Sequence, residues 1–137
     1  MSQDRSKYLL KKYGITAVEY AQMAIQQGGA CKCCGRVPTG DYPLHVDHSH
    51  KVAASKILMS KDAVTGKWIA QVMLADSPVL TSPVKADLIV AMKKWLLLKS
   101  VRGLVCWHCN TVLRWARDKA DVLRSAAKYL DDFAATL

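Results

Sequence analysis

A short segment of this chain concentrates groups that can transfer protons and bind cations. Residues 45–50 read His-Val-Asp-His-Ser-His, which places three of the chain's four histidines beside a carboxylate. Hydrolysis of a phosphodiester needs a base that activates water and a cation that offsets charge on the phosphate and the departing oxygen. His48 can be the base and Asp47 an oxygen ligand for Mg²⁺. Taken alone, the segment fits a second zinc site or an exposed histidine-rich loop equally well.

The backbone at Asp47 and His48 must be irregular if both side chains are to act on one phosphate. Residues 43–46 are a short, mainly apolar and extended stretch, and they predict a strand over residues 44–47 that leads into the polar segment. Successive side chains of a regular strand point to opposite faces, so Asp47 and His48 can serve one phosphate only if the strand ends or bulges there.

Two cysteine pairs form the second group of chemically active residues. Each pair has the spacing C-x-x-C, and together they supply the four thiolates of a closed tetrahedral zinc site: Cys31, Cys34, Cys106 and Cys109. Cys33 and His108 lie between these ligands as spare donors, and we expect them to be structural or exposed. A redox role for either pair is the alternative, but the chain has no thioredoxin-like βαβ pattern. The long gap between the pairs means that the metal would clasp distant segments.

Composition indicates the kind of partner that the chain binds and the cellular compartment in which it works. With 137 residues the chain fits one domain, and its net charge of +9 with a pI of about 9.5 predicts a polyanionic partner, although basic residues can also serve solubility alone. No signal peptide and no apolar run of membrane-spanning length are visible, so we expect a soluble cytoplasmic protein with no membrane partner. Cysteines there are kept reduced, which favours metal over disulfides.

Helical and strand patterns show which elements must hold these groups. A helix is predicted over residues 14–29, with a Thr16–Glu19 capping box and two glycines at its end. Residues 56–59 and 68–74, joined by a turn at 62–66, predict a β-hairpin. Residues 78–83 are expected to be a linker, because two prolines interrupt them.

The second half of the chain is predicted to be mainly helical. Residues 84–99 form an amphipathic helix on which Lys93 and Lys94 are either solvated or in contact with DNA. Residues 101–105 are strand-like, and a helix is expected over 110–117. A last helix follows, with its apolar residues on one face and its basic residues outward: Val122, Leu123, Ala126, Tyr129, Leu130 and Phe133, against Arg124 and Lys128.

Several of these motifs occur together in one known family. In order along the chain they are Gly14-Ile15-Thr16, Tyr20, Gln27-Gly28-Gly29, Cys31-x-x-Cys34-Gly35, Leu44-His45-Val46-Asp47-His48-Ser49-His50, Val101-Arg102-Gly103-Leu104-Val105-Cys106-x-x-Cys109-Asn110 and Leu123-Arg124-x-Ala126-Ala127-x-Tyr129-Leu130. By these residues the chain resembles the recombination endonuclease VII family, phage-associated members of the HNH or ββα-metal nucleases.

The resemblance implies a role for each residue of the site. The four paired cysteines would bind one structural zinc, while Asp47 and Asn110 would bind a catalytic Mg²⁺ or Mn²⁺ and His48 would be the general base. His50 would assist at the phosphate and His45 would orient the site. Arg102 would either contact a DNA phosphate or brace the second cysteine pair.

The implied fold is α+β, in a single domain over residues 1–137. A zinc-stapled ββα nuclease core would be split by a β-hairpin-plus-helix insertion at about residues 51–100, because relatives run almost directly from the first motif to the second. Helices would flank the core at both ends of the chain. Leu113 stands where some relatives have a further carboxylate, so metal binding would be completed differently here.

The expected function is metal-dependent cleavage of DNA. Duplex or branched DNA would be nicked or cut to 3′-hydroxyl and 5′-phosphate ends, by a monomer or a homodimer in the host cytoplasm. The main alternative is a zinc-stabilised DNA-binding module that does not cut. A thiol redox protein is the third interpretation, and tightly bound zinc at about one per chain would exclude it.

Overall fold

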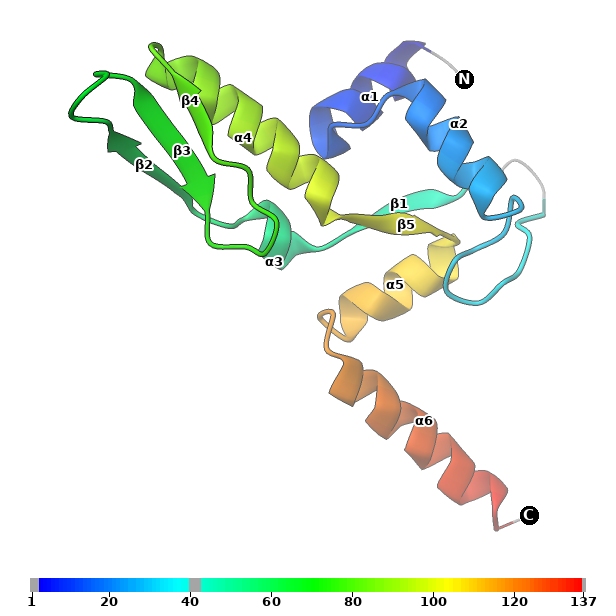
Figure 1. Cartoon of the computed structure of the whole chain (residues 1–137). Coiled ribbons are helices and arrows are strands. Elements are labelled where there is room, and N and C mark those ends of the chain that lie inside the picture. The colour runs from blue at the N-terminus through cyan, green and yellow to red at the C-terminus, as the bar shows by residue number, and fades with distance from the viewer. Residues whose placement is uncertain (1–2, 40–42, 137) are drawn as a thin grey trace.

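The fold mixes helices with two small antiparallel sheets, which confirms the α+β class. A computed structural model of the chain describes residues 3–39 and 43–136. The elements are α1 (Gln3–Tyr13), α2 (Ala17–Gln26), β1 (His45–His48), α3 (His50–Ala53), β2 (Ile57–Lys61), β3 (Trp68–Val72), β4 (Leu80–Ser82), α4 (Lys85–Ser100), β5 (Val101–Val105), α5 (Trp107–Trp115) and α6 (Ala120–Ala134) (Figure 1).

The first sheet joins two segments that are far apart in the sequence. β1 and β5 pair antiparallel, and α1 and α2 pack near them over one cluster of buried side chains (Figure 1). The predicted capping box of α2 is present, since the Glu19 amide donates to the Thr16 hydroxyl and the Glu19 carboxylate accepts from the Thr16 amide. α1 was not predicted. Its sequence is mostly polar, and only Leu9 and Tyr13 are buried, too few to mark a helix by periodicity.

The residues between β1 and β5 form a second layer with a hydrophobic cluster of their own. The hairpin predicted over 56–74 is observed as β2 and β3, and the helix predicted over 84–99 is α4. β4 pairs with β3, so residues 78–83 are not simply a linker, as predicted, but include the third strand of this sheet. Met92 and Leu88 of α4 are buried against the sheet. Two prolines flank β4 closely and hid the strand signal.

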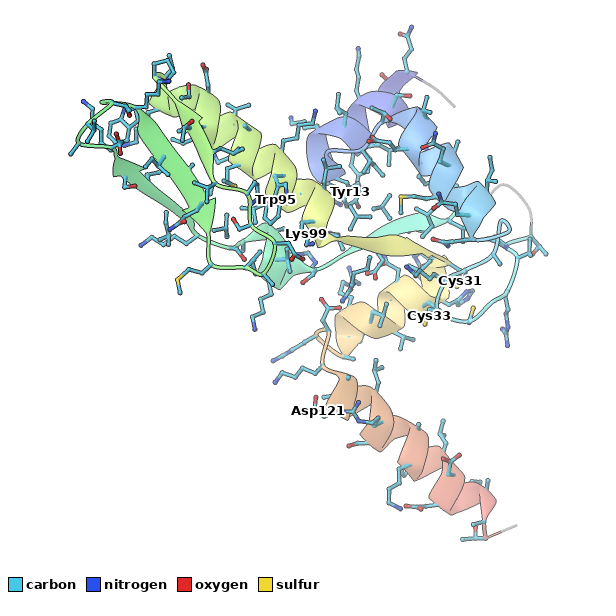
Figure 2. All side chains as sticks on the ribbon, viewed as in Figure 1. Tyr13, Cys31, Cys33, Trp95, Lys99 and Asp121 are labelled. Carbon is cyan, nitrogen blue, oxygen red and sulfur yellow. The ribbon has the colours of Figure 1, made fainter. Side chains whose placement is uncertain are left out.

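The two C-terminal helices follow the first sheet. The helix predicted over 110–117 starts earlier, at Trp107, because the Cys106 sulfur accepts a hydrogen bond from the Cys109 amide and caps α5. α6 is a helix as predicted, but its apolar face does not pack on the described chain: Leu123 is half-buried, and Tyr129, Leu130 and Phe133 are exposed. Figures 1 and 2 show α6 extending away from the other elements.

A search of the helices in residues 3–39 and 43–136 finds none with the length and apolar content that crossing a membrane requires.

Candidate active site

Four sulfur atoms from two distant turns meet at one end of the first sheet. The thiols of Cys31, Cys34, Cys106 and Cys109 all lie within 4.8 Å of one another. Those of Cys34 and Cys106 are 3.9 Å apart, close to the separation of about 3.8 Å that a tetrahedral zinc with Zn–S bonds of about 2.3 Å requires. The donor set therefore fits a structural metal such as zinc. Cys33 is exposed and is not one of the four converging thiols, although its side chain interacts with that of Cys109.

The electrostatics of the cluster also favour a bound cation. Burial raises the pKa of the Cys31 thiol, but backbone N–H groups around it outweigh burial and bring the pKa down to about 6. Burial and the neighbouring sulfurs raise the pKa of Cys109 far above its usual value. Four thiolates cannot share this space without a compensating positive charge, and a metal ion supplies one.

Backbone and side-chain contacts hold the first cysteine turn against β5. The Lys32 amide donates to the Leu104 carbonyl at 2.9 Å, and the Lys32 ammonium donates to the Arg102 carbonyl at 2.8 Å. The Gln27 side chain bonds both backbone groups of Leu104. These contacts hold the two cysteine pairs close together. They also place α5, which follows Cys106, beside β1.

The predicted irregularity in the first strand is present. The register of β1 against β5 shifts between Asp47 and His48, because Asp47 is opposite Gly103 while His48 is opposite Val101. Arg102 is the extra residue in β5. The shift is a β-bulge in β5, opposite the end of β1. Asp47 and His48 both line the same cavity.

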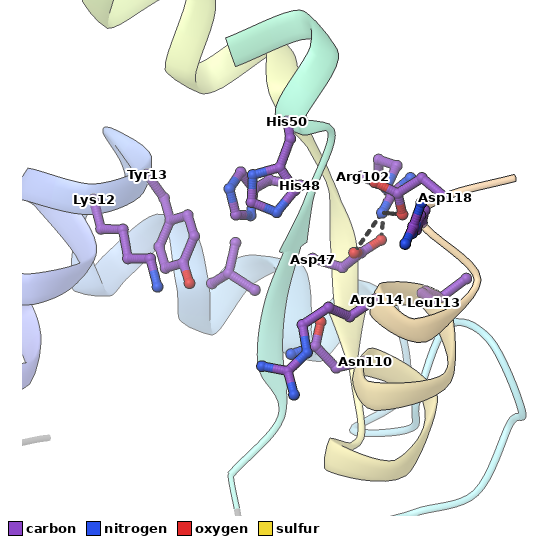
Figure 3. A pocket seen from close by; sticks show the side chains of 12 residues that line it. Lys12, Tyr13, Asp47, His48, His50, Arg102, Asn110, Leu113, Arg114 and Asp118 are labelled. Carbon is purple, nitrogen blue, oxygen red and sulfur yellow. Dashed lines mark hydrogen bonds and ion pairs between the residues drawn. The ribbon is translucent and has the colours of Figure 1, made fainter. Parts of the chain in front are cut away.

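That cavity collects most of the residues singled out in the sequence. Its volume is about 460 Å³, and it lies between α1, the bulge and α5 (Figure 3). The residues that line it are Lys12, Tyr13, Val46, Asp47, His48, His50, Arg102, Asn110, Leu113, Arg114, Arg117 and Asp118. A carboxylate and an amide oxygen, from Asp47 and Asn110, are hard donors of the kind that Mg²⁺ and Mn²⁺ bind. The residues present thus fit a divalent cation.

His48 occupies an aromatic environment at one side of the cavity. Its imidazole lies between the ring of Tyr13, with centres 5.1 Å apart, and the ring of His50, with centres 4.5 Å apart (Figure 3). Burial lowers the pKa of His48, and the positive charges of His50, Lys12 and Arg102 act in the same direction against the opposing effect of Asp47. A pKa below the ordinary value favours the neutral imidazole, which can accept a proton.

Asp47 is buried and accepts two hydrogen bonds from one arginine side chain. The Arg102 Nε and Nη2 atoms each donate to one oxygen of Asp47 at 2.7 Å, and Nη2 also donates to Asp118 Oδ1 at 2.8 Å (Figure 3). The hydrogen bonds to Asp47 and Asp118 raise the pKa of Arg102 above its ordinary value despite the opposing effect of burial. Contact between Arg102 and a DNA phosphate stays a prediction.

Three of the residues named as candidates for DNA contact lie elsewhere. His45 lines a second, smaller cavity with residues of α1 and α2. Lys93 and Lys94 are exposed on α4 and line neither cavity.

The fold also brings to the cavity residues that no sequence pattern had singled out. Lys12 and Tyr13 come from the unpredicted α1. Arg114 follows Asn110 by four positions, which is the spacing of one helix face, so the pattern could have indicated it, whereas Arg117 lies beyond the end of α5. Asp118 lies beyond the end of α5 and had no such signal.

Comparison with known proteins agrees with these motifs. The model of one family, described as recombination endonuclease VII, matches residues 6–132. The chain belongs to the recombination endonuclease VII family. This confirms the resemblance seen in the sequence.

Relatives of the chain in the same comparison come from phages. The chain is 29% identical over 123 residues to "Gene 59 protein" of Mycobacterium phage D29 and 28% identical over 123 residues to the protein of that name from Mycobacterium phage L5. In both cases the match covers 89% of this chain and 47% of the relative, so the chain spans about half the length of these relatives. No solved structure gives a significant match.

Proposed function

We propose that this chain is a metal-dependent DNA endonuclease of the HNH kind. In this proposal β1, β5 and α5 are the ββα core, the four-cysteine cluster holds a structural zinc, and residues 51–100 are an insertion between the two strands. Membership of the recombination endonuclease VII family supports nuclease activity on DNA.

The convergence of Asp47, His48 and Asn110 on one cavity is the observation that carries the proposal. The three residues lie on two elements, β1 and α5, and the pairing of β1 with β5 together with the cysteine cluster at the start of α5 supports their convergence. A histidine whose lowered pKa favours the neutral, basic form lies beside two hard oxygen donors. This is the set of groups that phosphodiester hydrolysis needs.

Basic side chains around these three residues suit a polyanionic substrate. Lys12, Arg114 and Arg117 line the cavity, and neither arginine forms an ion pair within the described part of the chain. Such residues contact phosphates, which position DNA without reading its sequence. We therefore propose that binding is directed by phosphates and by DNA shape, and that a branched DNA is a substrate to test beside the duplex.

The proposed reaction uses the residues as follows. His48 accepts a proton from the attacking water, and His50 beside it helps to hold the phosphate. Asp47 and Asn110 hold a Mg²⁺ or Mn²⁺ ion, which when bound offsets negative charge on the phosphate and on the departing 3′ oxygen. The basic residues keep the backbone in place during the attack. The products carry 3′-hydroxyl and 5′-phosphate ends.

Cleavage of supercoiled plasmid and of a four-way junction tests the proposal. Wild type and His48→Ala are compared with Mg²⁺, with Mn²⁺ and with EDTA. His108→Ala is the matched control, because His108 is exposed and lies outside both the cavity and the cysteine cluster. We expect metal-dependent cutting by wild type and by the control, and a loss of at least about 100-fold in the His48 variant.

Two outcomes would overturn this function. If zinc-loaded wild type binds both DNAs and cuts neither with any metal, the chain is the non-catalytic binding module. If His48→Ala cuts as fast as wild type, another residue is the base. Gel filtration of the free protein and of its junction complex decides between a monomer and a homodimer.

A further inference from the structure

The proposed cation site is short of negative charge. Of its two donors, Asp47 is charged and Asn110 is neutral, so one carboxylate would face an ion of charge +2. Leu113 lies one turn after Asn110 on α5 and lines the same cavity, but its side chain offers no donor. Mg²⁺ and Mn²⁺ prefer oxygen ligands and are bound in proteins largely by carboxylates. A second carboxylate near Asp47 would supply what Leu113 cannot.

Asp118 brings a carboxylate to this place from the turn between α5 and α6. The backbone at Arg117 and Asp118 is left-handed, with φ angles of 53° and 56°. The Asp118 amide donates back to the Leu113 carbonyl at 3.0 Å, as in the common termination of a helix. The turn reverses the chain, and Asp118 lines the cavity together with Asp47 and Asn110 (Figure 3).

One cationic nitrogen already lies between the two carboxylates. Arg102 Nη2 is 2.7 Å from Asp47 Oδ1 and 2.8 Å from Asp118 Oδ1. Two oxygens from separate elements therefore converge on a single positive centre. The Asp47 side chain is 10% exposed, that of Asp118 is 28% exposed and that of Arg102 is 37% exposed, so the ion pairs are only partly shielded from bulk water. In the absence of Arg102, the two carboxylates would repel each other at short range.

We propose that Asp118 is the second carboxylate of the divalent-cation site, and that Arg102 neutralises the pair when no cation is bound. This inference rests on the proposed function and deepens it. When a cation binds, Arg102 gives up its contacts with Asp47 and Asp118, and its guanidinium becomes available to a DNA phosphate. Asp118 thus replaces in space the carboxylate that α5 lacks at Leu113.

Titration of the zinc-loaded protein with Mn²⁺, followed by electron paramagnetic resonance without DNA, measures the site directly. Asp118→Asn is the test variant, because Asn tolerates a left-handed backbone and can still accept a hydrogen bond from Arg102. Asp121→Asn is the matched control. It removes the same charge three residues later, on an exposed position of α6 outside the cavity.

We expect Asp118→Asn to weaken Mn²⁺ binding by about 10-fold to 100-fold, and the control to bind like wild type. Adding Leu113→Glu to Asp118→Asn is expected to restore part of the lost affinity, since position 113 lines the same cavity. Arg102→Gln is expected to bind Mn²⁺ more tightly than wild type, because the competing cation is gone. Zinc content and circular dichroism identify any variant that has not folded.

The results separate this inference from the proposed function. If wild type binds Mn²⁺ and cuts DNA while Asp118→Asn binds Mn²⁺ equally well, only the role of Asp118 is wrong. If Arg102→Gln binds Mn²⁺ more weakly, Arg102 does not compete with the cation. If wild type neither binds Mn²⁺ nor cuts DNA, the endonuclease proposal and this inference both fail. Should Asp118→Asn not fold, Arg102→Gln still tests the inference, because tighter Mn²⁺ binding is expected of it and equal or weaker binding would contradict the competition between Arg102 and the cation.

Discussion

The ring of Tyr13 packs against the imidazole of His48, with centres 5.1 Å apart and planes inclined at 70°. This edge contact joins α1 to the last residue of β1. It limits the orientations open to the imidazole from one side, while His50 does so from the other. The N-terminal helix therefore acts on the site through the group that we propose to be the base.

Replacing Tyr13 tests that orienting contact. Tyr13→Phe keeps the ring and should leave kcat/KM for plasmid cleavage near the wild-type value. Tyr13→Leu removes the ring, frees the imidazole, and should lower kcat/KM by about 10-fold to 100-fold. Tyr129→Leu, on exposed α6, is the control for loss of an aromatic ring. Thermal melts are recorded for all variants, because Tyr13 is also buried. Equal rates for the Phe and Leu variants would rule out an orienting role.

The lowered pKa of His48 predicts how activity depends on pH. A general base works when it is neutral, so activity falls as pH drops through its pKa. Burial and nearby positive charges place that pKa below the ordinary value of 6.5, and a bound divalent cation adds to the effect. We expect the acid limb of the kcat/KM profile to have its midpoint below pH 6.5, with full activity at pH 7. Nuclear magnetic resonance titration of the His48 ring checks the assignment, and a midpoint above 7 would contradict it.

Loss of a zinc ligand should affect folding as well as metal content. Cys109→Ser removes one of four sulfurs and loosens the start of α5, where Asn110 lies. Because metal binding in such clusters is coupled to folding, we expect zinc to fall well below one per chain and Tm to drop by roughly 10 °C or more. Cys33→Ser removes an exposed thiol outside the cluster and should retain zinc. Elemental analysis and circular dichroism measure both. Full zinc content in Cys109→Ser would exclude the four-sulfur site.

The bulge in β5 depends on a glycine. Gly103 has a φ of +152°, and a Cβ there would lie 2.5 Å from Lys32 Cδ and 3.2 Å from Gln27 Oε1. Gly103→Ala should lower the free energy of unfolding by about 2–4 kcal/mol through strain and the displaced contacts. Gly66→Ala also has positive φ but meets open space, so it isolates the backbone cost of about 1–2 kcal/mol. Urea denaturation measures both. Equal losses in the free energy of unfolding of the two variants would show that the Lys32 and Gln27 side chains move aside at no cost.

Arg114 of α5 should contribute to DNA affinity through a phosphate contact. If Arg114 contacts one phosphate, Arg114→Gln should weaken binding to every DNA sequence. It should also make the log–log salt dependence of the binding constant shallower by about 0.9. Lys67→Gln, in an exposed hairpin turn far from the cavity lining, provides the matched charge control. Fluorescence anisotropy over a range of salt concentrations measures the slopes. An unchanged slope would remove Arg114 from the proposed interface.

Local patterns in the sequence were enough to predict the cysteine pairs, α2 with its capping box, the hairpin and α4. Each depends on spacing within a few residues, which a chain shows before it folds. The need for a bulge between Asp47 and His48 also followed from strand geometry, and the structure has it. Family membership followed from the order of the motifs.

Contacts between distant segments could not be derived in this way. α1 is nearly all polar and is ordered by packing of Leu9 and Tyr13 under the first sheet. β4 exists because β3 offers it a partner. The apolar face of α6 predicted burial, but burial needs a surface to pack on, and the described chain does not provide one. Asp118 meets Asp47 only because the turn after α5 folds back on Arg102. Residue types and spacing thus determined which groups could do the chemistry, while tertiary packing, which depends on pairs far apart in the chain, decided which of them share the cavity.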